Sequence, residues 1–209
     1  MSFSFQHFRR FLLTIPYIVA HWLRDHLPFV WKVAESANAT LFHLCYAHRL
    51  RQIEPTAMQM ATPFEMVPIA DVPTDQLVAF FQKQPKELYR WFTPHGFETD
   101  DIKALQQNPS FLGYVFKQDG KIVSYFFLRC YCNGECYFGR LVDSPYMRQG
   151  IGTRMNQISF YISESLRLDS YQTIANGNIA SIRSCAKAYR LKPVRSIANG
   201  DILYKNCKL

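Results

Sequence analysis

Apolar residues recur along the chain at two spacings, and the change from one to the other marks the expected elements. In the first 60 residues the spacing is helical, with apolar or aromatic positions on one face at Val30, Val33, Ala37, Leu41, Leu44 and His48. Pro16 and Pro28 divide the earlier part into short pieces. We expect a helical extension over residues 1–60 that packs through this face on the rest of the chain or on a second subunit. An interfacial membrane helix stays open as the alternative.

From residue 64 onward, runs with strand character alternate with helical patterns. Residues 64–72 predict a strand, residues 73–84 a helix and the stretch from about Thr99 a second helix. Three consecutive strands then follow, joined by turns at Asp119-Gly120 and Asn133-Gly134.

The last third contains two more helices and three more strands. A helix with an apolar face follows the glycine pair at residues 150 and 152, and its face is formed by Ile151, Met155, Ile158, Ile162 and Leu166. Residues 171–175 predict a strand, and Asn178 caps a helix with Ile179, Ile182, Ala186 and Tyr189 on one face. Two strands around Asn199-Gly200-Asp201 close the chain. The expected class is α/β (α+β), with a mixed, mostly antiparallel twisted sheet flanked by helices.

Composition is typical of a folded chain, with 48% apolar and 19% charged residues among 209. We expect one domain over residues 61–209, preceded by the extension over residues 1–60. The charge is uneven. Residues 145–209 contain ten Lys or Arg and three acids, and so carry +7 of the net charge of +8. A basic C-terminal third implies an anionic partner, either nucleic acid or a multiply phosphorylated small molecule.

The six cysteines are scattered, which favours reduced thiols and a cytoplasmic protein. Cys130, Cys132 and Cys136 lie close together in sequence. A two-residue turn at Asn133-Gly134 would pair Tyr131 with Cys136 and place Cys136 on a different face from the other two cysteines. We therefore expect no zinc site, and no metal.

The longest early run without a formal charge, Phe11–Leu23, has 13 residues. A helix that spans a membrane needs about 20 apolar residues. We expect no transmembrane segment.

Gly150 and Gly152 stand at the entrance of a helix, between Arg148 and Arg154. The first backbone N–H groups of a helix have no partner within the helix, and its dipole is positive at that end. Glycines let a phosphate approach the backbone closely. The segment from Gln149 to Thr153 therefore predicts a phosphate-binding nest of amides.

The succession of strand, glycine loop, helix, strand, Asn-initiated helix and hairpin resembles the GNAT N-acetyltransferase superfamily over about residues 64–207. The family's loop pattern, Arg/Gln-x-x-Gly-x-Gly/Ala, falls on residues 147–152, with Met147 at the Arg/Gln position. A second pattern, Asn-x-x-Ala/Ser followed by an aromatic residue, falls on Asn178 and Ser181, with Cys185 in place of the aromatic residue. Met147 and Cys185 depart from the family patterns.

The resemblance implies acetyl-CoA as co-substrate and transfer of its acetyl group to a primary amine. It places the pantetheine arm along the strand end at residues 141–143, with the Val142 amide as oxyanion donor. Cys185 stands where the family often has a tyrosine that acts as the general acid and protonates the departing thiolate. The implied cofactor-binding residues are Leu141, Val142, Asp143, Arg148, Gln149, Gly150, Ile151, Gly152, Thr153, Asn178 and Ser181.

An ammonium group is no nucleophile, so the reaction needs a route for its proton. Asp143, Glu135, His95 and Tyr137 are open alternatives for the base. By its place in the family, the stretch from Trp91 to Leu105 would bind the acceptor, with Trp91, Phe92, His95 and Tyr137 as candidates. An amino sugar of a surface-polysaccharide precursor is the acceptor that we expect. A peptide N-terminus, a lysine and a polyamine stay open.

A second class of function stays open. The chain could bind acyl-CoA without catalysis, or its basic C-terminal part could bind RNA. Met147 and Cys185 favour a silent binder, whereas no RNA-binding aromatic motif accompanies the basic residues. A homodimer, and a peripheral membrane contact of the N-terminal helix, also stay open.

Overall fold

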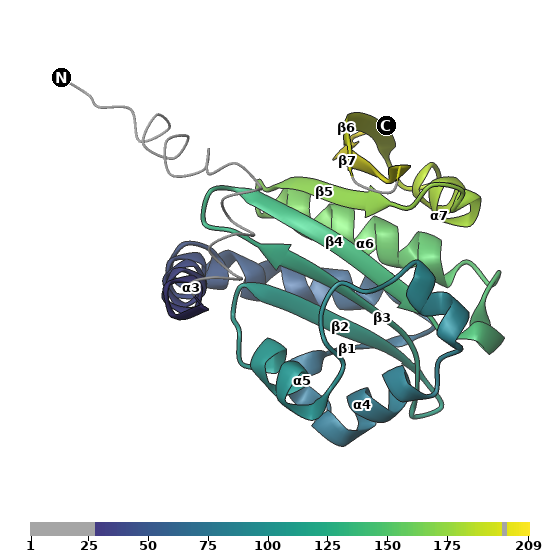
Figure 1. The fold of residues 1–209 in the computed structure, drawn as a ribbon, viewed down its shortest axis with the longest axis horizontal. Helices are drawn as coiled ribbons and strands as arrows, with labels where there is room; N and C mark the ends of the chain where they lie inside the picture. Colours follow the sequence, from purple (N-terminus) through teal and green to yellow (C-terminus); the bar gives the residue numbers. More distant parts are fainter. Residues whose placement is uncertain (1–27, 198–199) are drawn as a thin grey trace.

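The computed structural model describes residues 28–197 and 200–209. Its centre is a sheet of seven strands in the order β1-β2-β3-β4-β5-β7-β6 (Figure 1). Every pair of neighbours is antiparallel except β4 and β5, which are parallel. The strands are β1 Glu65–Pro68, β2 Phe111–Gln118, β3 Lys121–Cys130, β4 Glu135–Val142, β5 Asp169–Ile174, β6 Arg190–Ser196 and β7 Ile202–Cys207. The predicted mixed, mostly antiparallel sheet is confirmed.

Helices cover both faces of this sheet. The α-helices are α3 Pro28–Met60, α4 Thr74–Gln82, α5 Thr99–Gln106, α6 Ile151–Ser165 and α7 Ile179–Cys185. Three short 3-10 helices join them, namely η1 Ile69–Asp71, η2 Lys86–Arg90 and η3 Ser144–Tyr146. Side chains of α3 and α6 pack on one face of the sheet, and those of α4 and α5 on the other. The part of the predicted extension before residue 28 lies outside the described residues.

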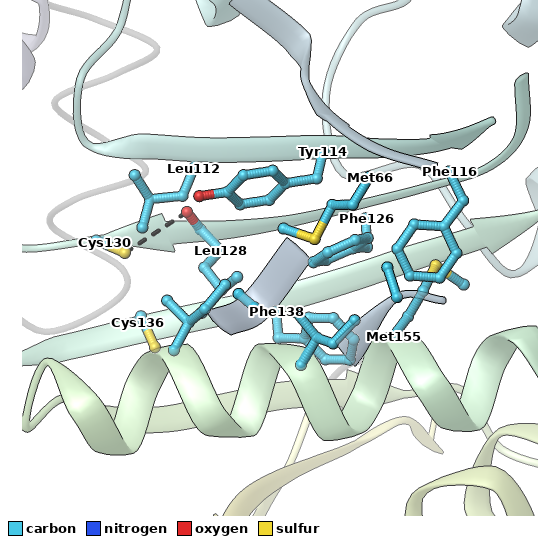
Figure 2. Packing of buried hydrophobic residues seen from close by; sticks show 14 of the residues in the cluster. Met66, Leu112, Tyr114, Phe116, Phe126, Leu128, Cys130, Cys136, Phe138 and Met155 are labelled. Atoms are coloured by element: carbon cyan, nitrogen blue, oxygen red, sulfur yellow. Dashed lines mark hydrogen bonds between the residues drawn. The ribbon is translucent and has the colours of Figure 1, made fainter. Parts of the chain in front are cut away.

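The core on the α6 face is rich in aromatic side chains (Figure 2). Phe126 of β3 stacks on Tyr114 with ring centroids 5.3 Å apart, and it meets Phe116 edge-on at 5.6 Å. The apolar face predicted for α6 is fully buried against this layer. The four- and three-residue spacing was a sufficient guide because α6 buries one stripe against a sheet.

The first strand is shorter than the predicted residues 64–72, because the chain turns into η1 after Pro68. The Val72 N–H bonds to the Ile69 carbonyl at 3.1 Å, and the Gln106 amide donates to both the Ile69 and Val72 carbonyls at 2.7 Å. The Gln106 side chain of α5 thus provides the hydrogen bonds that these two carbonyls would otherwise receive from a neighbouring strand.

The prediction of which face of α3 is buried is wrong. Val30, Val33, Leu41 and Leu44 are exposed, and α3 instead buries Phe42 and Ala57 against the sheet and α6. Phe42 stacks on Tyr46, with centroids 4.8 Å apart. This stripe contains the large side chains of Phe42, Tyr46 and Ile53, whose burial removes much apolar area from water, so it takes the inner position.

The face predicted for α7 is also wrong in part. Ile179 and Ile182 are exposed, whereas Cys185 and Tyr189 are buried. The helix has only seven residues and ends at Cys185. Ala186 and Tyr189 therefore lie beyond its end and do not continue the face formed by Ile179 and Ile182. The Asn178 cap is confirmed, since its side-chain oxygen accepts from the Ser181 N–H at 3.0 Å.

The register predicted for the β3–β4 hairpin is wrong. The Gly134 N–H bonds to the Tyr131 carbonyl and the Tyr131 N–H bonds to the Glu135 carbonyl, so the turn is longer than two residues. Gly134 has a φ of 92°, which supplies the extra residue of a bulge. Cys130 therefore lies directly opposite Cys136, and both are buried. Among residues 28–197 and 200–209, no three His, Cys, Asp or Glu side chains gather as metal ligands do.

In the part of the chain that the structure describes, no helix combines the length and the apolar character needed to cross a membrane.

Candidate active-site cleft

The parallel pair β4–β5 separates partway along its length. Its strands are paired only from Glu135 to Tyr137 on β4 and from Asp169 to Tyr171 on β5, and they diverge beyond these residues (Figure 1). The divergence creates a cleft of about 680 Å³. Its walls are the second half of β4, the second half of β5, the loop before α6 and the first part of α7.

The cleft passes from one face of the sheet to the other. Phe138 belongs to the core on the α6 face and Leu141 to the core on the α4 face, and both line the cleft. Because side chains alternate along a strand, the cleft meets the loop before α6 on one face and Trp91 on the other. Two reactants can therefore meet in it from opposite sides.

The glycine loop lies at one mouth of this cleft. Gly150 caps α6 with a φ of 82°, a left-handed conformation that favours glycine. The Arg154 N–H makes the first helical bond, to the Gly150 carbonyl at 3.0 Å. The preceding amides have no helical acceptor and are free for an anion. A Cβ at Gly152 would lie 3.3 Å from Ser184 Oγ, so the second glycine allows α6 and α7 to approach closely.

The Val142 amide is directed at the cleft. The next residue, Asp143, donates its N–H to the Val123 carbonyl of β3 at 2.9 Å. Successive amides of a strand point to opposite edges, so the Val142 N–H points away from β3 and toward the opening. β5 is not paired with β4 at this position.

The structure brings most of the predicted residues to the cleft. Its lining includes Trp91, Phe92, Leu141, Val142, Arg148, Gly150, Ile151, Gly152, Thr153, Asn178 and Ser181. Six predicted residues do not line it, namely Glu135, Asp143, Cys185, Gln149, His95 and Tyr137. Arg154 also points elsewhere, because its guanidinium donates to the Met60 carbonyl of α3 at 2.8 Å.

Asp143 ties the end of β4 to the end of α4. Its buried carboxylate accepts from Lys83 Nζ at 2.7 Å and from Gln84 Nε2 at 3.1 Å. A carboxylate held by two donors outside the cleft favours a structural role over that of a base.

We expect Asp143→Asn and Lys83→Met each to lower the free energy of unfolding by about 1–2 kcal/mol, because each removes one charged bond of a partly exposed pair. Urea unfolding measures this. The pH profile of turnover should keep its shape in both variants. A thousandfold loss of turnover in folded Asp143→Asn, with Lys83→Met unaffected, would instead identify Asp143 as the base.

Cys185 is fully buried behind the cleft wall. It accepts from Tyr189 Oη at 3.5 Å and lies 3.5 Å from Gln172 Oε1. Burial and the neighbouring Cys185 thiol raise the pKa of Tyr189, so its phenol stays protonated. This placement favours a packing role for Cys185.

His95 lies in the aromatic core of the α4 face. Its Nδ1–H donates to the Gly96 carbonyl at 2.6 Å, which leaves Nε2 to accept from the Tyr125 hydroxyl at 2.9 Å. Burial lowers the pKa of His95, although the Gly96 carbonyl and Asp101 partly raise it. Both ring nitrogens are therefore occupied away from the cleft.

Tyr137 stacks on Tyr171, with centroids 5.6 Å apart, at the last paired position of β4 and β5. Burial, followed by the nearby Glu135, raises the pKa of Tyr137 to about 12. The phenol is thus protonated at neutral pH and cannot act as a base there.

The main residue that sequence reasoning missed is Arg140. Its guanidinium donates to Ser181 Oγ at 3.0 Å and approaches Gln172 Oε1 at 3.5 Å, so it joins β4, β5 and α7 across the cleft. A charged residue in the middle of an otherwise apolar strand was the available signal. With it, the cleft is lined by Arg140, Arg148, Arg183 and Lys187, and by no Asp or Glu among the described residues.

The sheet order, the separated β4–β5 pair and the glycine-led α6 are features of one class of protein. The chain has the fold of the GNAT N-acetyltransferases, preceded by α3. No protein-family model matches the chain. No curated protein matches its sequence.

Three solved structures illustrate the likeness. The GNAT domain of PAT from S. lividans has a TM-score of 0.57 at 12% identity, covering 68% of this chain and 89% of that one. The microcin C7 self-immunity acetyltransferase MccE, in complex with acetyl-CoA and AMP, has a TM-score of 0.57 at 14% identity and coverage of 71% and 94%. The N-acetyltransferase PseH of Campylobacter jejuni has a TM-score of 0.51 at 16% identity and coverage of 70% and 99%.

Proposed function

We propose that this protein is an acetyl-CoA-dependent N-acetyltransferase. The observation that carries the proposal is one cleft through the sheet, onto which both the amide nest of α6 and the Val142 amide open. The nest and the nearby cations suit the diphosphate of CoA. The pantetheine arm would then follow β4 to Val142, pairing with the unpaired edge of the strand as an added strand does.

In the proposed reaction, the amine nitrogen attacks the thioester carbonyl carbon. The Val142 N–H donates to the oxygen as it becomes negative, and such a donor is worth about 3 kcal/mol in comparable sites. The C–S bond then breaks to leave the amide, and the proton lost by the attacking nitrogen is taken up by the CoA thiolate. Trp91 and Phe92 line the opposite side of the cleft, where the acceptor would bind. An amino sugar remains our proposal for it, because Trp91 is partly exposed and offers a ring for stacking.

Native mass spectrometry with acetyl-CoA tests the first half of the proposal, and amine-dependent release of the CoA thiol tests the second. We expect one acetyl-CoA per chain and release that requires an amine. A protein that binds no acetyl-CoA would overturn the proposal.

A second candidate is a silent acyl-CoA binder. It is favoured by one observation, the lack of any Asp, Glu or His in the described lining of the cleft. Binding of acetyl-CoA without release of thiol, over a wide panel of amines, is the outcome that would support it. RNA binding is less favoured, since three of the ten cations of residues 145–209, Arg148, Arg183 and Lys187, line the cleft and are proposed to face CoA.

A further inference from the structure

The acceptor side of the cleft has an uncharged wall. On the face of the sheet opposite the α6 loop, the cleft is lined by Leu88, Trp91, Phe92, Gly139, Leu141 and Thr173. These residues supply aromatic and aliphatic surface and one hydroxyl, and none of them has a carboxylate that could form an ion pair with an ammonium ion.

Charged and titratable groups do surround this wall, but no Asp or Glu belongs to the described lining of the cleft, and Glu87, the carboxylate of η2 next to Leu88, lies outside it. On the acceptor side the guanidinium carbon of Arg90 lies 4.8 Å from the ring centroid of Trp91. Tyr171 stacks on Tyr137, and Glu135 is close enough to Tyr137 to raise its pKa. The carboxylates of Asp143 and Asp169 each pair with a lysine, Lys83 and Lys205, at 2.7 Å. On the cofactor side stand Tyr146, Arg140, Arg148, Arg183 and Lys187, with Cys185 and Tyr189 buried behind them.

Arg140 places a positive charge in the cleft between β4 and β5. It is two residues before Val142 on the same side of β4, which corresponds to about 7 Å along the strand. Its side-chain contacts within the described chain are to neutral groups, namely Ser181, Gln172, Cys185 and the ring of Phe138. A cation in the cleft disfavours an ammonium ion at the reaction centre and favours the negative oxygen of the intermediate.

We propose that the acceptor is a singly charged, weakly basic amine, such as a peptide α-amine or a monoamino sugar, and not a lysine side chain or a polyamine. The inference rests on the proposed acetyl transfer. An α-amine has a pKa of about 8, and a lysine amine one of about 10.4, so far more of the α-amine is neutral at pH 7. A weakly basic amine can thus enter an uncharged wall without leaving an unpaired charge, and it reacts without a base in the cleft.

The test compares four acceptors at pH 7: alaninamide, glucosamine, Nα-acetyl-lysinamide and spermidine. Release of the CoA thiol gives kcat/KM for each. We expect the better of the first two to exceed both of the others by at least about tenfold, and the rate with alaninamide to rise with pH until its own amine is neutral. Equal or faster transfer to the lysine amide or spermidine would overturn the inference.

A designed carboxylate provides a second test. Thr173 is exposed, lies on β5 and lines the acceptor side of the cleft, so Thr173→Asp places a charge on the wall. We expect this variant to shift the preference toward spermidine by about tenfold, while Thr173→Asn, its neutral match, leaves the preference unchanged. If folded Thr173→Asp keeps the preference of the unmodified protein for weakly basic amines over spermidine, the proposal that the uncharged wall sets this preference is contradicted.

Failure of the proposed function has a different signature from failure of this inference. If acetyl-CoA binds and no amine of either kind is acetylated, acetyl transfer to amines is overturned, and the inference with it. If amines are acetylated without the preference for weakly basic ones, the proposed function stands and only the inference is lost.

Discussion

Gly150→Glu is expected to abolish acetyl-CoA binding, with an affinity at least about a hundredfold weaker, equivalent to about 3 kcal/mol. The new carboxylate would stand at the N-terminus of α6, where the cofactor diphosphate is proposed to bind. No atom lies within 4 Å of a Cβ built at Gly150, so the first carbon of the new side chain meets no neighbour. Isothermal titration calorimetry with acetyl-CoA measures the loss.

Gly120→Glu is the matched control. Gly120 also has a positive φ, 73°, with no atom within 4 Å of its Cβ position, and it lies in the β2–β3 turn away from the cleft. Both variants carry the same backbone strain, about 1–2 kcal/mol, and the same added charge. We expect only Gly150→Glu to lose the cofactor. Equal affinities in the two variants would remove the glycine loop from the cofactor site.

Phe42→Ala is expected to lower the free energy of unfolding by about 3–5 kcal/mol. Phe42 is 1% exposed and packs in the same core as the sheet residues Phe126 and Phe138. Its loss would leave a cavity between α3 and the sheet. Thermal or urea unfolding followed by circular dichroism measures the change.

Leu44→Ala separates this result from a general effect on helix α3. Leu44 is 75% exposed and belongs to the stripe that the spacing of apolar residues predicts to be buried. We expect a change within about 0.5 kcal/mol, which is typical of exposed positions. A large loss for Leu44→Ala in solution would mean that the exposed face of α3 is covered by a partner, for example a second copy of the chain.

Much of the fold follows from local patterns. The turns at Asp119-Gly120 and Asn133-Gly134, the apolar face of α6 and the Asn178 cap are all in place, because each depends on residues within one turn or one helix. The glycine loop of the site is similarly local. Its conformation is encoded by Gly150, which has a positive φ, and by the helix that follows it.

The predictions from sequence that were wrong concern places where a segment has more than one possible packing or hydrogen-bonding partner. Periodicity found an apolar stripe on α3, but α3 has a second stripe, and only packing against α6 and the sheet selected the one with Phe42. The dipeptide Asn133-Gly134 predicted a turn correctly, but the hydrogen bonds of Tyr131 set its length and placed Cys130 opposite Cys136.

The sequence by itself determined the order of the strands and helices and the glycine-led start of α6, because short-range spacing and turn residues encode them. Only the tertiary structure decided which side chains reach the cleft. It directed Asp143 to Lys83, His95 to Tyr125 and Cys185 into the core, and it brought Arg140, Gln172 and Ser181 together. The physical reason is that the separation of β4 from β5 joins residues far apart in sequence, and no local spacing records such a separation.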